Sequence, residues 1–260
     1  MYGLKNVAAA AAIVCGVFMA SCGSVRPAVV PEAPVEKTEP PAERFIDRLA
    51  ARLETRDIDG AIALFDELTA EEAGQTPNRR LKASVLLSAR RLPEAREIAE
   101  KLVGEDESDV ESRYIMANIE AASGKAREQR LLLEKIVTDA PDYVPALNDL
   151  GQMFIGAKRL KDAAGCFDRA LAASPLDMDA ILGRASVYRF ERKPDEAEAL
   201  LSRAVELYPR RSEPYSERGR FYRETGKINK ALADLDAAAA IDPDNYWIRY
   251  DKGRTLLDTR

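Results

Sequence analysis

The chain has 260 residues, with 39 Lys plus Arg against 44 Asp plus Glu, a formal charge of −5 and no histidine. Without histidine, the Ser-His-Asp and Cys-His arrangements of hydrolases, imidazole metal ligands and a histidine pH switch are all excluded. The evenly mixed charges argue against nucleic acid as a partner, and the three scattered cysteines are too few for a disulfide framework or a zinc site.

The first 21 residues have the pattern of a secretory signal. Lys5 precedes an apolar stretch from Val7 to Ala20, which is too short to span a bilayer comfortably. This stretch closes on Met19-Ala20-Ser21-Cys22, which resembles the lipobox of bacterial lipoproteins. The resemblance implies cleavage before Cys22, acylation of Cys22 and a stable anchor in a membrane. An uncleaved anchor helix is the alternative.

Residues 22–41 are predicted to form a linker. They contain five prolines and no apolar periodicity, a composition typical of an extended, semi-rigid spacer. Gly23 stands where enterobacterial lipoproteins retained at the inner membrane carry aspartate. By that resemblance, the expected location is the bacterial cell envelope, with the protein lipid-anchored in the outer membrane and facing the periplasm.

A 34-residue period fills the rest of the chain. It connects four prolines, Pro141, Pro175, Pro209 and Pro243, and a series of alanines that only Gln129 interrupts. The period divides the chain into six full repeats and a half repeat: 42–75, 76–109, 110–143, 144–177, 178–211, 212–245 and 246–260. Positions are counted from 1 within each repeat.

Each repeat is predicted to form two helices. In repeat 144–177, apolar and small residues recur at three- and four-residue spacing, which is typical of one buried helix face. Pro175 ends the second helix, because its ring clashes with the preceding turn and it lacks an amide donor. The inward residues are Leu147, Leu150, Gly151 and Phe154 in the first helix and Leu160, Ala163, Phe167 and Ala170 in the second.

This pattern resembles the tetratricopeptide repeat, with glycine or alanine at position 8, alanine at positions 20 and 27, and proline at position 32. The early repeats depart from it at Glu107, Glu120 and Gln129. The resemblance implies an all-α fold, an α-solenoid in which six repeats stack into a right-handed superhelix. The last half repeat, 246–260, is expected to form a C-terminal capping helix.

The resemblance also implies a peptide-binding groove lined by first-helix positions 2, 5, 9 and 12. In this chain those positions include Tyr114, Asn118, Asn148, Gln152, Arg189, Arg220, Arg223, Tyr250 and Arg254. Amides satisfy a peptide backbone, and arginines match carboxylates. The alternative is that these residues are ordinary solvent-exposed positions. The four arginines lie among acidic residues that are able to neutralise them: Glu213, Glu217, Glu224 and Asp251.

Three other features have simple structural explanations. Basic residues recur at position 7 of the repeats: Arg48, Lys82, Arg184, Arg218 and Lys252. We expect their aliphatic stems to pack on the helices while the charged groups reach solvent. The alternative is a functional basic stripe. Cys166 stands at an apolar position and is expected to be a buried, unreactive thiol. Gly124-Lys125 lacks the other elements of a phosphate loop and is expected to be a turn between helices.

The functional hypothesis is a membrane-anchored lipoprotein that binds a protein or peptide partner and serves as an adaptor, for example in envelope assembly or secretion. No catalytic group, metal ligand or cofactor site is predicted. Two alternatives remain open. One is a ligand-binding accessory for transport or envelope polymers, which would use the arginine cluster. The other is a purely structural spacer.

Overall fold

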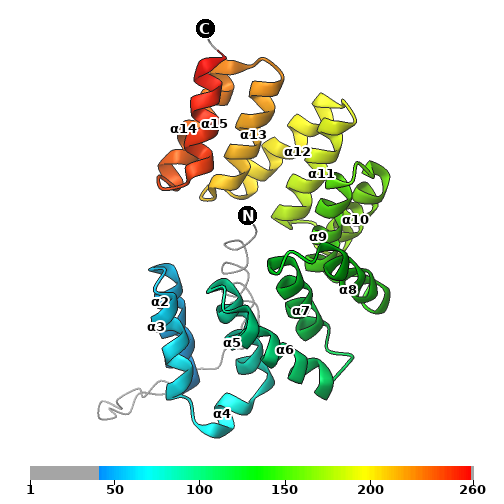
Figure 1. Cartoon of the computed structure of the whole chain (residues 1–260). Coiled ribbons are helices and arrows are strands. Elements are labelled where there is room, and N and C mark those ends of the chain that lie inside the picture. Colours follow the sequence, from blue (N-terminus) through cyan, green and yellow to red (C-terminus); the bar gives the residue numbers. More distant parts are fainter. Residues whose placement is uncertain (1–40, 259–260) are drawn as a thin grey trace, which may run out of the picture. The chain divides into compact units, whose positions relative to one another are not determined.

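The structure, a computed structural model, describes residues 41–258. Every regular element in this part of the chain is a helix, so the prediction of an all-α repeat fold is confirmed (Figure 1). Three predicted features lie outside the described residues: the signal peptide, the lipidation of Cys22 and the linker residues 23–40.

The helices follow the 34-residue period. In chain order they are α2 (Pro41–Glu54), α3 (Ile58–Ala63), the 3-10 helix η1 (Leu64–Glu67), α4 (Ala70–Gly74), α5 (Thr76–Ser88), α6 (Leu92–Glu105), α7 (Val110–Ala122), α8 (Ala126–Asp139), α9 (Val144–Gly156), α10 (Leu160–Ala173), α11 (Met178–Phe190), α12 (Pro194–Leu207), α13 (Ser212–Glu224), α14 (Ile228–Ile241) and α15 (Tyr246–Leu257).

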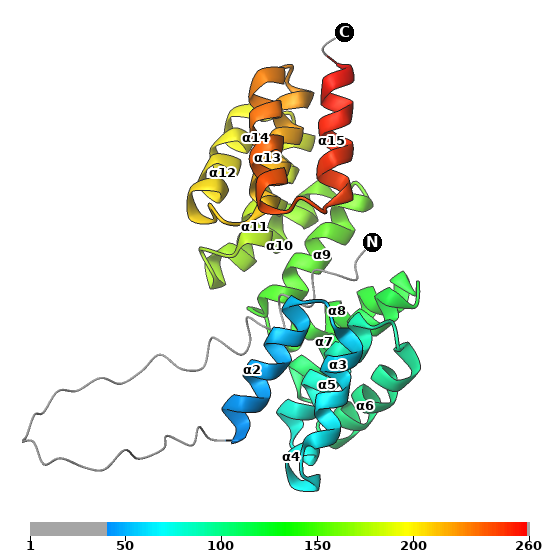
Figure 2. The same ribbon diagram turned by 90° about the vertical axis from the view of Figure 1, so that its left-hand side faces the viewer.

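The chain divides into two compact units, residues 1–132 and 133–260, and the division falls within α8. In unit 2, each first helix packs on the second helix of its own repeat, as α9 does on α10. Each second helix then packs on the next first helix, as α14 does on α15 in both views of the chain (Figures 1 and 2). This alternation buries apolar surface that a single helix pair leaves exposed.

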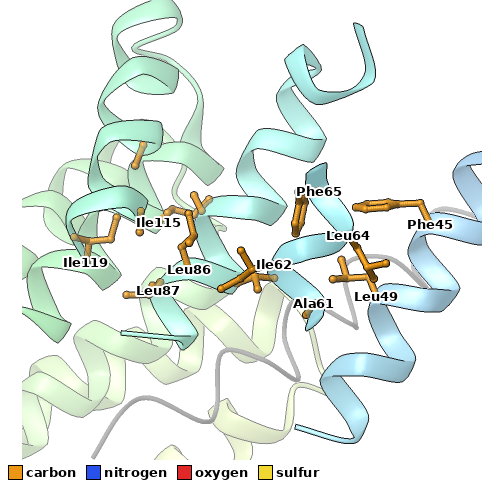
Figure 3. Close-up of a cluster of buried hydrophobic side chains, with 14 residues drawn as sticks. Phe45, Leu49, Ala61, Ile62, Leu64, Phe65, Leu86, Leu87, Ile115 and Ile119 are labelled. Carbon is orange, nitrogen blue, oxygen red and sulfur yellow. The ribbon is translucent and has the colours of Figure 1, made fainter. Parts of the chain in front are cut away.

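The core of unit 1 joins α2, α3, η1, α5, α6 and α7. Phe45 and Phe65 meet edge to face with ring centroids 5.2 Å apart, and Leu86 and Ile119 lie deeper in the same cluster (Figure 3). In unit 2 the buried apolar residues form clusters between the first and second helices, one on α9 to α11 and another on α11 to α14. The largest fully buried side chains in this unit include Leu147, Phe167, Ile181, Leu201, Phe221 and Leu235.

The turn between the two helices has the same backbone in all six full repeats. Residue 15 of each repeat has a positive φ: Arg56, Arg90, Gly124, Lys158, Arg192 and Gly226. At Gly124 the amide of the next residue, Lys125, bonds to the carbonyl of Glu120, so the left-handed residue closes the first helix. The prediction that Gly124-Lys125 forms an inter-helix turn is confirmed.

The recurring prolines mark a bond between neighbouring repeats. Arg169 donates from Nη2 to the carbonyl of Pro141 over 2.6 Å, and Arg203 makes the same bond to Pro175 over 3.0 Å. Both arginines stand at position 26 of the following repeat. These bonds satisfy carbonyl groups at turns where the preceding second helix has ended.

The first repeat departs from the predicted pair of helices. Its second helix is divided into α3, η1 and α4, and Leu68 between them is extended. Thr69 then begins α4 with a capping box, in which its side chain accepts from the amide of Glu72 and the Glu72 carboxylate accepts from the amide of Thr69. This local signal for a new helix start ends the older helix early.

Candidate functional site

The nine predicted groove residues lie on first helices in two units. Tyr114 and Asn118 are on α7 in unit 1, and both are partly buried. The other seven lie on α9, α11, α13 and α15, which all belong to unit 2. We call these seven the first-helix face of unit 2: Asn148, Gln152, Arg189, Arg220, Arg223, Tyr250 and Arg254.

The side-chain amide of Asn148 is hydrogen-bonded through its nitrogen, and its oxygen has no hydrogen-bond partner. Its Nδ2 donates to Oδ1 of Asp177 over 2.7 Å, and the same oxygen accepts from the amide of Ala180 at the start of α11. The bond to a carboxylate fixes the orientation of the Asn148 amide. Its Oδ1 is buried and has no hydrogen-bond partner, while Gln152, one turn further along α9, is exposed.

Arg189 is held by two acidic residues of the next repeat. Its Nη2 donates to Oε1 of Glu224 over 2.6 Å, and its Nη1 lies 3.7 Å from Oε2 of Glu217. Only 17% of the Arg189 side chain is exposed. The guanidinium therefore links α11 to α13.

Arg220 continues the same network from α13 to α15. Its Nε donates to Oδ2 of Asp251 over 2.8 Å, and its Nη1 donates to Oε1 of Glu217 over 2.9 Å. Burial lowers the pKa of the Arg220 guanidinium. The two carboxylates more than offset this effect, so its pKa lies above the ordinary value. Glu217 thus bridges Arg189 and Arg220.

The remaining two arginines differ from each other. Arg223 is mostly buried and pairs with Asp258, with Nη1 to Oδ2 at 3.6 Å. Arg254 is exposed, and its guanidinium lies 5.8 Å from the ring centroid of Tyr250. Within the described residues, Arg254 is the only one of the four arginines without a carboxylate partner.

An aromatic cluster stands at the start of α15. Trp247 lies edge to face with Tyr246 and with Tyr250, with centroids 5.2 and 5.8 Å apart. All three rings are exposed, and Tyr246 and Tyr250 stack on each other at 6.2 Å. Exposed rings that are held by one another present apolar area with a polar edge, as aromatic residues do at protein interfaces.

The first-helix face of unit 2 presents hydrogen-bonding groups and aromatic rings, and little of its positive charge is unpaired. Three of the four arginines are neutralised by carboxylates, so an anionic ligand would have to displace Glu217, Glu224, Asp251 or Asp258. Of the predicted neutralising residues, Glu217, Glu224 and Asp251 act in this way, whereas Glu213 pairs with Arg211.

A sequence model of the tetratricopeptide repeat matches residues 50–110, 114–178 and 182–246. The chain belongs to the tetratricopeptide repeat family. No curated protein matches its sequence. Tetratricopeptide proteins bind protein or peptide partners, and the fold is typically a non-catalytic scaffold for such interactions.

Several solved tetratricopeptide structures are similar to this chain. The hetero-tetramer Cut9-Hcn1 of the APC/C is 14% identical with a TM-score of 0.66, covering 84% of this chain and 47% of that one. A MamA double mutant, RS-1 ArsTM, is 18% identical with a TM-score of 0.52, covering 64% and 93%. YrrB, described as having an unusual peptide-binding site, is 22% identical with a TM-score of 0.49, covering 73% and 97%. At these identities the similarity concerns the fold.

The basic residues at tetratricopeptide position 7 form ion pairs along the repeats. Arg184 donates to Asp168 over 2.7 Å, and Lys252 lies 2.6 Å from Asp236. Each of these acids stands at position 25 of the preceding repeat. The three other members also have acidic partners: Arg48 pairs with Glu67, Lys82 with Asp66 and Arg218 with Asp234. The charged groups of all five residues therefore form ion pairs, and they do not make a free basic stripe.

Sequence reasoning did not assign Trp247 to the binding face. Trp247 stands at position 2 of the last repeat, so the family's own rule for groove positions includes it.

The acidic partners Glu217 and Asp251 both stand at position 6, one turn from the arginines of the same face. Their pairing across repeats was not predictable from one repeat alone, because the partners come from successive helices.

Residues 41–258 contain one cysteine, Cys166, and no histidine. No group of three His, Cys, Asp or Glu side chains in this part of the chain is placed to hold a metal ion. Cys166 is buried as predicted, and burial raises the pKa of its thiol, which keeps it protonated and unreactive. None of the helices in residues 41–258 is both long enough and apolar enough to cross a bilayer.

Proposed function

We propose that this protein is an adaptor whose first-helix face in unit 2 binds an extended segment of a partner protein. The observation that carries the proposal is the set of hydrogen-bonding and aromatic side chains on this face, where the Asn148 amide is fixed by Asp177 and Gln152 is exposed one turn further along α9. Side-chain amides of this kind carry donors and acceptors that match those of a peptide backbone.

The other residues of the face suit the same ligand. Gln152 is exposed on the next turn of α9 and carries both a donor and an acceptor for a peptide backbone. Trp247 and Tyr250 offer exposed rings to an apolar side chain. The paired Arg189 and Arg220 hold successive first helices in place, so that the face is pre-organised before the partner arrives.

Photocrosslinking tests the proposal directly. A benzophenone amino acid is placed at Gln152 in the full-length protein, and the control carries it at Ala172, which is exposed on the second helix α10. The expected result is one discrete crosslinked partner from position 152 and none from position 172. A smear of products from both positions, or the same partner from both, would contradict the assignment of the face.

We further propose that the adaptor is tethered to a bacterial membrane through an acylated Cys22. The membrane proposed is the outer membrane, with the repeats in the periplasm. The support is the signal-like stretch at 1–21, which ends on Ala20-Ser21-Cys22, and the proline-rich residues that follow. An alkyne-tagged fatty acid should label the wild-type protein in cells, and Cys22→Ser should abolish the label. Equal labelling of both proteins would refute the anchor.

The alternative of an anionic small molecule or glycan on the arginine cluster receives less support. Its three best-placed members, Arg189, Arg220 and Arg223, already have carboxylate partners. A thermal shift assay with anionic metabolites separates the two hypotheses, since a ligand of the folded state raises the melting temperature by mass action. The structural spacer predicts no crosslinked partner at Gln152.

A further inference from the structure

The turns between the first and second helices of unit 2 carry cations at a position that favours glycine. Position 15 of each repeat has a positive φ, a backbone conformation that glycine adopts freely and that costs energy in other residues. In unit 2 this position is glycine only at Gly226, whereas Lys158 and Arg192 adopt it with φ of 59°. Backbone strain that a fold retains is a reason to look for a function at the strained residues.

The side chains of these two cations are unpaired. Neither forms an ion pair or a side-chain hydrogen bond within residues 41–258, and the same holds for Lys161, which is exposed on the first turn of α10. The cations at position 16 of the same repeats differ, because each has a carboxylate partner, as Arg159 has in Asp162 over 2.7 Å. The unpaired positive charge of these turns therefore lies on Lys158, Lys161 and Arg192.

These three cations lie at one edge of unit 2. The two helices of a repeat are antiparallel and joined by a short turn, 157–159 or 191–193, so α9 and α11 run in the same direction, and they also pack on each other. Their carboxyl ends and the turns that follow them therefore face the same edge. The acids Asp195 and Glu196 stand on the first turn of α12, where they complement the positive end of that helix. We call the following residues the turn edge of unit 2: Lys158, Lys161, Phe190 and Arg192.

Phe190 adds an exposed aromatic ring to the turn edge. It is the last residue of α11, and it is 59% exposed. Because α13 packs on α11, Phe190 belongs to an interior repeat of the stack and not to its last helix. Its counterparts at position 13 are Gly156 and Glu224, so a large apolar side chain is particular to this repeat. Cations beside an exposed ring are typical of surfaces that lie on anionic lipids, where the ring enters the interface and the cations contact phosphate.

We propose that the turn edge of unit 2 rests on a membrane surface that contains anionic lipids. Lys158, Lys161 and Arg192 contact lipid phosphates, and the ring of Phe190 enters the headgroup layer. A contact of so few side chains is weak on its own, and a tether to the same membrane strengthens it by raising the effective concentration. In the cell the proposal rests on the tether proposed above, whereas vesicles test it without acylation of Cys22.

Quenching of a tryptophan by brominated lipids tests the contact. Phe190→Trp is made in the full-length Trp247→Phe protein, so that residue 190 is the only tryptophan. This tryptophan should lose about half of its emission on vesicles of brominated phosphatidylcholine with about 30% phosphatidylglycerol, and little on phosphatidylcholine alone. The loss should disappear in about 0.5 M NaCl, which screens the charges. The matched control is Leu176→Trp in the same background, which should show little quenching, because Leu176 is 56% exposed at a turn on the opposite edge.

Charge reversal tests the cations separately from the ring. Arg192→Glu in the Phe190→Trp protein should remove the quenching by anionic vesicles while the melting temperature stays unchanged. Arg210→Glu should keep the quenching, because Arg210 is an exposed arginine in the turn between α12 and α13, on the opposite edge. The proposal would be overturned by absent quenching, by equal quenching of the tryptophans at 190 and 176, by equal quenching on neutral vesicles, or by a loss that Arg192→Glu leaves intact.

Two further measurements distinguish other anionic partners. A rise of the melting temperature in inorganic phosphate that Arg192→Glu abolishes, without quenching by vesicles, would assign a soluble anion and overturn the membrane contact. A benzophenone amino acid at position 190 that crosslinks one protein in cells would assign an acidic protein partner and overturn it as well. The tether is judged separately by the fatty-acid label at Cys22, so failure of the tether and failure of the turn edge are distinguishable.

Discussion

Arg220 on α13 and Asp251 on α15 form a partly buried ion pair, with Nε to Oδ2 at 2.8 Å. The side chain of Asp251 is only 8% exposed, and Glu217 contacts the same guanidinium. The pair therefore joins two successive first helices on the face proposed to bind a partner. Its main effect is on the stacking of the repeats, and binding benefits because the stack holds the face in one arrangement.

Asp251→Asn removes the charge from this pair while keeping the shape of the side chain. We expect it to lower the free energy of unfolding by about 1–2 kcal/mol, between the values for exposed and for fully buried ion pairs. Urea unfolding monitored by circular dichroism measures this change. The control is Asp236→Asn, since the partner of Lys252 is 59% exposed and should cost less than about 0.5 kcal/mol. Equal losses in both variants would show that burial of Asp251 is unimportant.

Lys158→Gly tests the left-handed residue of the inter-helix turn. Lys158 has φ of 59° and is exposed, so glycine relieves backbone strain without removing a packed side chain. We expect the variant to be more stable by about 0.5–1 kcal/mol in thermal or urea unfolding. The opposite substitution, Gly226→Ala, places a Cβ at φ of 74° and should destabilise by a similar amount. A loss of stability in Lys158→Gly would contradict the turn geometry.

Gly151→Ala tests the close packing of α9 on α10. The added Cβ would lie 2.5 Å from the Phe167 ring, which is fully buried and cannot move away freely. We expect a loss of about 1–3 kcal/mol, as in other overpacked cores. Gly165→Ala on α10 is the control, because its Cβ meets nothing within 4 Å and alanine favours the helix. That variant should gain about 0.5–1 kcal/mol, and the two variants should therefore shift the urea midpoint in opposite directions.

Stability should fall in acid through buried carboxylates such as Glu120. Its hydrogen bond from Arg96, with Nη1 to Oε1 at 2.5 Å, is the main cause that lowers its pKa below the ordinary value of 4.5. A lowered folded-state pKa contributes stability that is present above pH 4.5 and is lost as the pH falls below it. Because the chain has no histidine, the free energy of unfolding should change little between pH 6 and 8.

Glu120→Gln identifies the contribution of this carboxylate. The variant should be less stable than wild type at neutral pH, and the difference between the two proteins should shrink as the pH is lowered through the acid range. Glu128→Gln is a suitable control, since Glu128 is exposed on α8. An unchanged pH dependence in Glu120→Gln would assign the acid loss to other groups.

Much of the fold was predictable from the sequence, because the repeat period is uninterrupted. The alanines and prolines 34 residues apart place a helix pair in every repeat, and α9 to α14 follow that prediction closely. The first repeat was less predictable. There the capping box at Thr69 competes with the continuation of the second helix, and the period alone does not show which signal prevails.

The sequence by itself determined the helical repeats, the positions that face the core and the residue types on the first helices. These follow from local propensities and from a periodicity that each repeat carries within itself. Only the tertiary structure decided that Glu217 and Asp251 neutralise Arg189 and Arg220. The partners come from successive helices of the stack, and the side chains that meet there depend on how those helices pack.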